Sequence, residues 1–450
     1  MTLHLDSRRA DLERFFGGEA PREIVKQNSG RTVYRVAAGD PALYVKRFPR
    51  ELLRDRAKHE AAMLRALEEA GLPCPRLVAT ARDREGSYVV TEEVVGAPVL
   101  KSLVVGGGHD VRRLLAAMAE VTRRMFDAKI DHGDWHVGNA LVRDGRIWVL
   151  DVHRARRVAC VTASRRREIV AFAAMSFRDS VPVTEMLRFI RRCGVTDHDA
   201  ILDVWARLRR LQARYYDSRL DRCTVESTAF GVRDGIYYRK GADVDAIVAA
   251  VATPGRVVKA TGWESLEKLG DRWFVKRTSR RRAVDFWRNA HGLAMRGVGA
   301  PKLFACGGAW VVGEWVEGPH LMDFVRERVP SMGRSERDAF LFRLARMIRR
   351  MHARGAYHRD LKGGNVVVGP DAGFYLVDLD AVRFRREVSE RRRVFNLAQL
   401  NASLPAPLTR ADRLRFLRWY AGRESGVWRR RAEWVRRVMK ITVDRKHQWP

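Results

Sequence analysis

YHRDLKGGNVVV, Tyr357 to Val368, followed by FYLVDLDAVRF, Phe374 to Phe384, is the stretch that decides the fold of this chain. Its two apolar runs flank a turn that carries Asp360 and, five residues later, Asn365. The second apolar run ends on Asp378, thirteen residues after Asn365. An Asp and an Asn at this spacing, with a second Asp at the end of a strand, are typical of a loop that orients an attacking hydroxyl and binds a metal ion.

The first half of the chain contains the same pattern. DHGDWHVGNALV, Asp131 to Val142, precedes RIWVLDVHRAR, Arg146 to Arg156. Asp134 and Asn139 are again five residues apart, and Asp151 follows Asn139 by twelve residues. Asp and Asn are common turn formers, but two ordered copies of the whole pattern favour a functional site over a structural turn.

The repeat extends well beyond this loop. Three pairs of segments align in the same order: Val121 to Val142 with Met347 to Val368, Leu67 to Ala79 with Leu293 to Ala305, and Leu43 to Phe48 with Trp273 to Thr278. Two copies of roughly 200 residues each indicate a duplicated domain and not a solenoid. The sequence therefore predicts two domains, residues 1–222 and 223–450, and the second opens with a hairpin at 229–241.

Each copy predicts the same order of elements. Short strand-like runs come first, and a segment of helical period follows, at Asp55 to Ala70 and at Arg281 to Arg296. A further strand, a long helix, the Asp-bearing loop and more helices complete the copy. The predicted fold class is therefore α+β, with a small sheet-rich lobe and a larger helical lobe in each copy.

Length and composition indicate a globular chain with an unusual charge. The 450 residues are 46% hydrophobic, and 86 Lys and Arg stand against 54 Asp and Glu, a formal charge of +32. Such a surface attracts polyanions: nucleic acid, anionic lipid head groups or phosphorylated sugars. The alternative is a solvated basic surface without a partner.

Cysteine usage and the apolar runs bear on the compartment. The five cysteines are scattered without a CxxC pair, which indicates neither a disulfide framework nor a zinc site and fits a reducing cytosol. The N-terminus lacks the apolar core of a secretory signal, and no apolar run reaches the length of a bilayer span. We therefore expect a cytoplasmic chain that is at most peripheral on a membrane.

A lysine within a strand-like run precedes each loop. Lys46 lies 88 residues before Asp134, and Lys276 lies 84 before Asp360. Phosphoryl transfer requires a cation on the donor phosphates, carboxylates on the metal and a carboxylate that positions the attacking hydroxyl. The two lysines are predicted to bind ATP, and Asp134 and Asp360 to act as the base or orienting carboxylate. The predicted metal ligands are Asn139 and Asp151 in the first copy and Asn365 and Asp378 in the second.

The two loops resemble those of known families. The loop HRDLKGGN resembles the catalytic loop of eukaryotic-type kinases, and HGDWHVGN resembles that of small-molecule kinases such as aminoglycoside and choline phosphotransferases. Three features together resemble the bacterial lipopolysaccharide core kinases, which phosphorylate heptose or 3-deoxy-manno-octulosonic acid (Kdo). They are the two loops, the stretch RAVDFWRNAHGLAMRGVGAPKLFACGG and the DLDA context of Asp378.

This resemblance covers nearly the whole chain as two copies. It implies tandem protein-kinase-like domains that use ATP and Mg²⁺. It also implies a lipid A–core glycolipid as acceptor, reached from the cytoplasmic side of the inner membrane with contact to anionic lipid. A nucleic acid partner is then not expected.

The chain departs from the protein-kinase pattern at the phosphate loop and the helix acid. Neither copy has a clean GxGxxG: the first offers Asn28 to Thr32, and the second Thr261 to Ser265. The Glu that pairs with the strand lysine could be Glu60 in the first copy. The second copy has Phe286 at the aligned position, with Asp285 beside it.

Other side chains near the loops have predicted auxiliary roles. Lys362, two residues after Asp360, would stabilise the transferring phosphoryl group, and the first copy has His136 there. His132 and His358 are expected to brace the loops. The first copy could therefore be a slower enzyme, an enzyme of different specificity or a degenerate scaffold.

Two other functions stay open. HRDLK favours a Ser/Thr protein kinase, although no APE-like motif follows Asp378. A double pseudokinase that binds anionic lipid or nucleic acid would keep the carboxylates without turnover. The segment Gly426 to Ile441, with Trp428, Val435, Val438 and Met439 near one face and Arg opposite, is expected either to pack on the helical lobe or to lie on anionic lipid.

Overall fold

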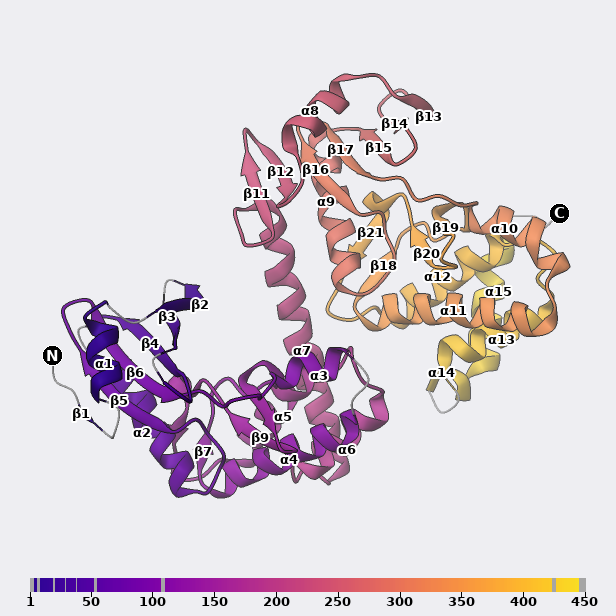
Figure 1. The fold of residues 1–450 in the computed structure, drawn as a ribbon. Helices are drawn as coiled ribbons and strands as arrows, with labels where there is room; N and C mark the ends of the chain where they lie inside the picture. The colour runs from indigo at the N-terminus through magenta and orange to yellow at the C-terminus, as the bar shows by residue number, and fades with distance from the viewer. Residues whose placement is uncertain are drawn as a thin grey trace. The chain divides into compact units, whose positions relative to one another are not determined.

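The computed structural model describes residues 4–5, 9–18, 21–28, 30–37, 39–51, 55–106, 110–422 and 426–444. The chain divides into two compact units, residues 1–211 and 212–450. The division falls inside the long helix α7 (His198–Asp221), labelled in Figure 1. The predicted boundary after residue 222 lies just past the end of that helix and stays a prediction.

The first unit begins with an antiparallel sheet. Within the described residues its strands follow the order β1-β5-β6-β4-β3-β2. The elements of this lobe are β1 (His4–Leu5), α1 (Arg9–Phe16), β2 (Arg22–Asn28), β3 (Arg31–Val36), β4 (Leu43–Pro49), α2 (Arg56–Glu69), β5 (Leu77–Arg82) and β6 (Gly86–Glu92). Side chains alternate along β4, so Val45 joins one face of the sheet and Lys46 points to the other, toward α2.

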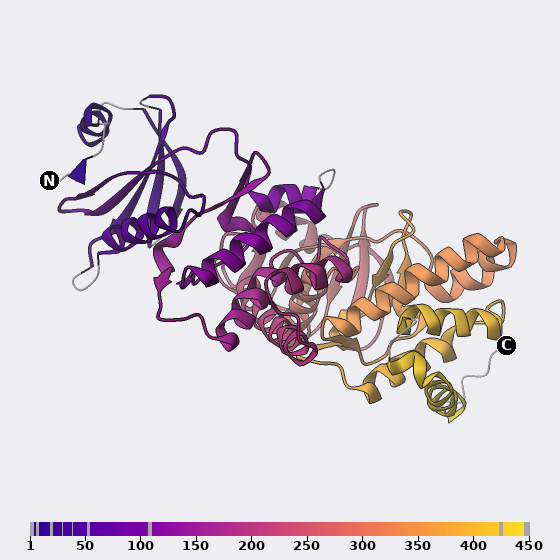
Figure 2. The same cartoon turned by 90° about the horizontal axis from the view of Figure 1, so that it is seen from below.

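The helical lobe of the first unit holds the first Asp-bearing loop. Its elements are α3 (Leu100–Gly106), α4 (Val111–Asp127), β7 (Ile130–Asp131), β8 (Ala140–Arg143), β9 (Arg146–Val149), β10 (Arg156–Arg157), α5 (Ala163–Met175), α6 (Val183–Arg192) and α7. The pairs β7–β10 and β8–β9 bring the loop before β8 next to the turn after β9. In Figure 2 the sheet of this unit (indigo) and the helices that follow it (purple) form two distinct lobes.

The second unit repeats this plan with a longer sheet. Its order among the described strands is β11-β12-β16-β17-β15-β14-β13. The elements are β11 (Phe230–Arg233), β12 (Ile236–Arg239), α8 (Val244–Ala252), β13 (Arg256–Ala260), β14 (Ser265–Leu269), β15 (Trp273–Arg277), α9 (Arg280–Met295), β16 (Leu303–Gly307) and β17 (Trp310–Glu314). The predicted hairpin is confirmed as β11–β12. It turns at Asp234 and Gly235, both with positive φ, and joins the edge of the sheet along β16.

The helical lobe of the second unit holds the second loop. Its elements are α10 (Leu321–Arg328), α11 (Arg334–Ala353), β18 (Ala356–His358), β19 (Val366–Val368), β20 (Phe374–Leu376), β21 (Val382–Phe384), α12 (Glu390–Ser403), α13 (Arg410–Ala421), α14 (Gly426–Arg429) and α15 (Arg431–Asp444). A sheet-rich lobe followed by a helical lobe thus occurs twice, and the predicted α+β fold class is confirmed.

The C-terminal segment packs on the helical lobe, the first of its two expected positions. Trp434 is fully buried, and α15 packs along α12. Trp428, Val435 and Val438 lie half-buried against the same core. Within the part of the chain that the structure describes, no helix combines the length and apolar character needed to cross a bilayer.

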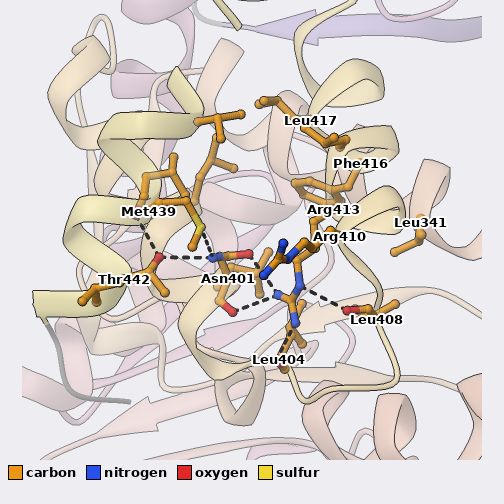
Figure 3. A pocket seen from close by; sticks show the side chains of 16 residues that line it. Leu341, Asn401, Leu404, Leu408, Arg410, Arg413, Phe416, Leu417, Met439 and Thr442 are labelled. Carbon is orange, nitrogen blue, oxygen red and sulfur yellow. Dashed lines mark hydrogen bonds between the residues drawn. The ribbon is translucent and has the colours of Figure 1, made fainter. Parts of the chain in front are cut away.

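An apolar cavity of about 700 Å³ lies between α11, α12, α13 and α15. Its lining is mostly leucine and valine, and Figure 3 shows that the polar side chains of Asn401, Arg410, Arg413 and Thr442 also line it. Asn401 donates to Thr442 Oγ1 over 3.1 Å, and Arg413 donates to the backbone oxygens of Asn401, Leu404 and Leu408. Because α12 also contacts the second loop, one helix borders both the cavity and the candidate active site.

Candidate active site

In the second unit, strand pairing brings the loop and the second Asp together. β18 pairs with β21 and β19 with β20, so Asp360, Asn365 and Asp378 lie at one end of these short ribbons. Asn365 Nδ2 donates to the backbone oxygen of Asp360 over 2.8 Å and lies 3.3 Å from its Oδ2. Asp378 has a left-handed backbone (φ 57°), so the extended conformation of β20 does not continue through it.

His358 fixes the spacing between these two segments, as predicted for a bracing residue. Its ring is fully buried; Nδ1 accepts from the Asp360 amide over 3.1 Å and Nε2 donates to the Asp378 carbonyl over 3.2 Å. Burial lowers the pKa of His358, so the ring is neutral and serves both bonds.

A buried polar network on α12 supports the same loop. The Asn396 side chain is bonded to both the amide and the carbonyl of His358, and Gln399 Nε2 donates to the Arg359 carbonyl over 2.7 Å. Ser403 Oγ accepts from the Gly363 amide over 2.7 Å. These bonds satisfy loop backbone groups that burial would otherwise leave without partners, and they hold Asp360 in place.

Lys276 is the centre of a carboxylate cluster. Its Nζ lies 3.1 Å from Asp380, 3.4 Å from Glu264 and 3.7 Å from Asp378, and the side chain is only 9% exposed. Its ammonium also lies 5.0 Å from the centre of the Phe286 ring. Phe286, which aligns with Glu60 of the first copy, therefore contributes an aromatic face and not a carboxylate. The acids come instead from Glu264 in the β13–β14 turn and from Asp380, two residues after Asp378.

The charges of this cluster shift the two aspartates in opposite directions. Burial and the neighbouring charge of Asp380 raise the pKa of Asp378. Burial also disfavours the ionised form of Asp380, but the charge and hydrogen bond of Lys276 outweigh it and lower the pKa of Asp380. Asp378 is 41% exposed on its side chain, so it is the carboxylate open to an incoming ligand.

Lys362 lies beside the predicted base. Its Nζ is 2.8 Å from Asp360 Oδ2, and both side chains are about half exposed. A cation at this position can follow a phosphoryl group toward an acceptor oxygen, so its placement suits the predicted role.

The first unit places the equivalent residues in the same frame. Asn139 Nδ2 donates to the Asp134 carbonyl over 2.8 Å. His132 donates to the Leu150 carbonyl over 2.9 Å and accepts from the Asp134 amide over 3.3 Å, and burial lowers its pKa to about 4. Asp151 again has a left-handed backbone (φ 61°). The predicted residues of both copies are thus brought together, and their roles stay predictions.

The lysine of the first unit has a different partner. Lys46 Nζ lies 2.5 Å from Glu60, which is almost fully buried on α2, and 3.6 Å from Asp151. The structure thus pairs Lys46 with the helix acid that the sequence indicated.

Asp151 is held by two side chains that the sequence did not indicate. Arg31, at the start of β3, donates to both carboxylate oxygens, and the second of these bonds measures 2.6 Å. His153 donates over 2.7 Å. Burial disfavours the charge, but the bond from His153 and the charges of Lys46 and Arg31 hold the pKa of Asp151 far below its ordinary value.

The residues that differ between the two sites, Arg31 and Glu264, come from the two loops that were expected to cover the ATP phosphates. In the loop from Asn28 to Thr32, Ser29 lies outside the described residues, and Arg31 points to Asp151. In the loop from Thr261 to Ser265, Glu264 lies by Lys276. Strand register, and not a fixed distance along the chain, brings Arg31 and Glu264 to their sites, so no sequence motif marks them. Asp380 differs, because it follows Asp378 by two residues in the sequence.

The two sites differ in their fit to Mg²⁺. Magnesium takes hard oxygen ligands, usually one or two side chains together with substrate phosphates. In the second unit, Asp378 and Asn365 would fit this ion, because the cluster around Lys276 has three carboxylates to one ammonium. In the first unit, Asp151 does not fit, because Arg31 and His153 occupy its oxygens. No three His, Cys, Asp or Glu side chains of the described residues form a preformed metal cage.

A strand lysine facing an Asp–Asn loop and a second Asp, between a sheet-rich and a helical lobe, defines the protein-kinase-like class of phosphotransferases. The comparison with family models narrows this class. The model of the lipopolysaccharide kinase (Kdo/WaaP) family matches residues 23–192 and again 259–420. The chain therefore belongs to this family, and the prediction of two tandem copies is confirmed.

Curated relatives match shorter parts of the chain. A protein described as "EKC/KEOPS complex subunit BUD32" from Encephalitozoon cuniculi (strain GB-M1) is 30% identical over 132 residues, 29% of this chain and 59% of that protein. A rice protein (Oryza sativa subsp. japonica) described as "Putative cyclin-dependent kinase F-2" is 41% identical over 100 residues, 21% of this chain and 28% of that protein. The chain thus spans under two thirds of each relative, and the second of them is described as a kinase.

Proposed function

We propose that this protein is an ATP- and Mg²⁺-dependent kinase that phosphorylates a sugar hydroxyl, of heptose or Kdo, in the lipopolysaccharide core. Membership of the lipopolysaccharide kinase family supports the acceptor class. The single observation that carries the catalytic part is the second site, where Asp360, Asn365, Asp378 and Lys276 lie in one braced arrangement.

The chain's own residues suit an in-line transfer. Asp360 would orient the sugar hydroxyl and accept its proton as the hydroxyl oxygen bonds to the γ-phosphorus and the bond to the ADP oxygen breaks. Lys276 would bind the donor phosphates, and Lys362 would face the charge that develops on the transferred group. Magnesium held by Asn365 and Asp378 would neutralise phosphate charge.

The surface charge supports an anionic glycolipid acceptor. A formal charge of +32 favours the approach of a phosphorylated lipid A–core and of the anionic lipid around it. The short connection between β21 and α12, residues 385–389, leaves little room for an activation segment that would bind a peptide. This observation favours a sugar acceptor over a protein.

The test follows labelled phosphate. The full chain is incubated with γ-labelled ATP and Mg²⁺ and, separately, with acylated core glycolipid, deacylated core oligosaccharide and a generic protein. The Asp360→Asn variant is the control for contaminating kinases. We expect label on a core sugar, lost in that variant.

Other results would redirect the proposal. Label on the protein acceptor alone would identify a protein kinase, the rival function that the HRDLK motif favours. Absence of Mg²⁺-dependent ATP turnover with every acceptor would identify a pseudokinase.

A further inference from the structure

Arg31 and Glu264 occupy the same place in the two copies. Each stands two residues before the strand residue that pairs with the lysine, Lys46 in β4 and Lys276 in β15. The register of the two sheets therefore aligns an arginine with a glutamate.

A second exchange accompanies the first. The residue two positions after the metal Asp is His153 in the first copy and Asp380 in the second. Each contacts the central charges of its own site: His153 donates to Asp151 over 2.7 Å, and Asp380 lies 3.1 Å from Lys276. Where the second copy has the acids Glu264 and Asp380, the first copy therefore has an arginine and a histidine.

The exchanges reverse the charge balance around the lysine. In the first copy, the cations Lys46 and Arg31 meet the anions Glu60 and Asp151 in equal number. In the second copy, Glu264, Asp378 and Asp380 outnumber the single ammonium of Lys276 by two charges. Lys259 acts on Asp378 electrostatically but forms no ion pair with it in the described residues. A divalent cation would neutralise the second site and would add unbalanced charge to the first.

The geometry agrees with the charges. The guanidinium of Arg31 forks onto both oxygens of Asp151, which leaves that carboxylate 13% exposed, whereas Asp378 is 41% exposed. A metal ion that bound Asp151 would have to displace this partly buried bidentate arginine and leave its guanidinium without the carboxylate, and that cost opposes metal binding.

We propose that the first copy is a metal-independent site, in which the guanidinium of Arg31 occupies the place that a divalent cation takes in the second copy. All divalent metal binding then belongs to the second copy. The inference goes beyond the proposed function, since it concerns cation binding and needs no sugar acceptor.

The experiment measures Mn²⁺ binding to the full chain by electron paramagnetic resonance and calorimetry, with a non-hydrolysable ATP analogue and without acceptor. Asp378→Asn should weaken the metal site roughly 10–100-fold, and the matched Asp151→Asn should leave it unchanged. Equal losses in these two variants would overturn the proposal, whatever the enzyme later proves to phosphorylate.

A charge exchange sharpens the test. Arg31→Glu with His153→Asp reproduces the second site in the first copy and should create an additional Mn²⁺ site per chain. The converse pair, Glu264→Arg with Asp380→His, should abolish the existing site. Circular dichroism checks that each variant is folded. Failure of the folded first pair to gain a metal site would show that Arg31 does not decide the difference.

Discussion

The two copies have the same loop and different surroundings. In both, the loop Asn donates to the carbonyl of the loop Asp over 2.8 Å, and a neutral His bridges the loop to the second Asp or to the residue before it. Behind the loop they diverge. Both copies keep a serine whose hydroxyl accepts from a loop amide, Ser176 in the first and Ser403 in the second. The residue seven positions before this serine differs: it is Ile169 in the first copy and Asn396 in the second.

The difference shows that the same loop residues can stand in chemically different surroundings. In the second copy, Asn396 and Gln399 of α12 bond to the loop and Asp378 is open, whereas the first copy has Ile169 in place of Asn396 and the oxygens of Asp151 are occupied. A duplicated site can thus keep its recognisable motif while the positions set by register and packing change its chemistry.

The largest expected effect separates the two carboxylates. Asp360→Asn should lower the rate of phosphate transfer by about 10²–10⁴-fold, because an amide cannot accept the hydroxyl proton. Asp134→Asn, the matched change, should have a much smaller effect. Rates with labelled ATP measure both. A greater loss in Asp134→Asn would assign catalysis to the first copy.

A smaller effect is expected behind the loop. Asn396→Ala removes hydrogen bonds to both backbone groups of His358 and leaves these buried groups without partners, which should cost about 1–3 kcal/mol of stability and lower kcat. Denaturant unfolding and steady-state kinetics measure the two effects. Asn401→Ala, on the cavity side of the same helix, is the control and should leave kcat unchanged; equal kcat losses in the two variants would contradict a specific bracing role.

The pH dependence should also distinguish the units. In the first unit, burial lowers the pKa of His132 to about 4. In the second unit, burial lowers the pKa of His352 to about 4 and the pKa of His291 to about 3. Each ring stays neutral when folded and binds a proton when unfolded, so its stability contribution is present above the unfolded pKa and is lost as the pH falls from about 6.5.

Each such histidine should lower the free energy of unfolding by about 2 kcal/mol at pH 5 relative to pH 7.5. Unfolding followed by hydrogen exchange in each unit should therefore show the larger acid loss in the second. Replacing His352 by Gln should reduce that loss. A greater acid loss in the first unit would contradict the assignment of neutral buried histidines.

The smallest expected effect concerns Lys362. Its ion pair with Asp360 is half exposed, so Lys362→Met should change stability by less than about 1 kcal/mol. The variant should lower kcat more than it raises KM for ATP, because the cation acts on the transferred group. An effect on KM alone would assign Lys362 to nucleotide binding.

The sequence predicted what lies in contiguous motifs. Asp360, Asn365 and Asp378 follow each other within one loop and one hairpin, so their spacing was enough to place them. The partner of Lys276 was not predictable, because the expected helix position holds Phe286 and the acids come from two separate segments. Arg31 was missed for the same reason, since strand register and not sequence distance brings it to Asp151.

The β11–β12 hairpin has a consequence for how a duplicated chain avoids pairing with itself. Two similar sheets in one polypeptide offer matching strand edges, and unpaired edges invite exchange between repeats and aggregation during folding. The hairpin covers β16 in the second sheet, whereas the equivalent edge strand β5 of the first is covered by the two-residue β1. Unlike covers at corresponding edges make the two sheets poor templates for one another, so each copy is directed to complete its own sheet.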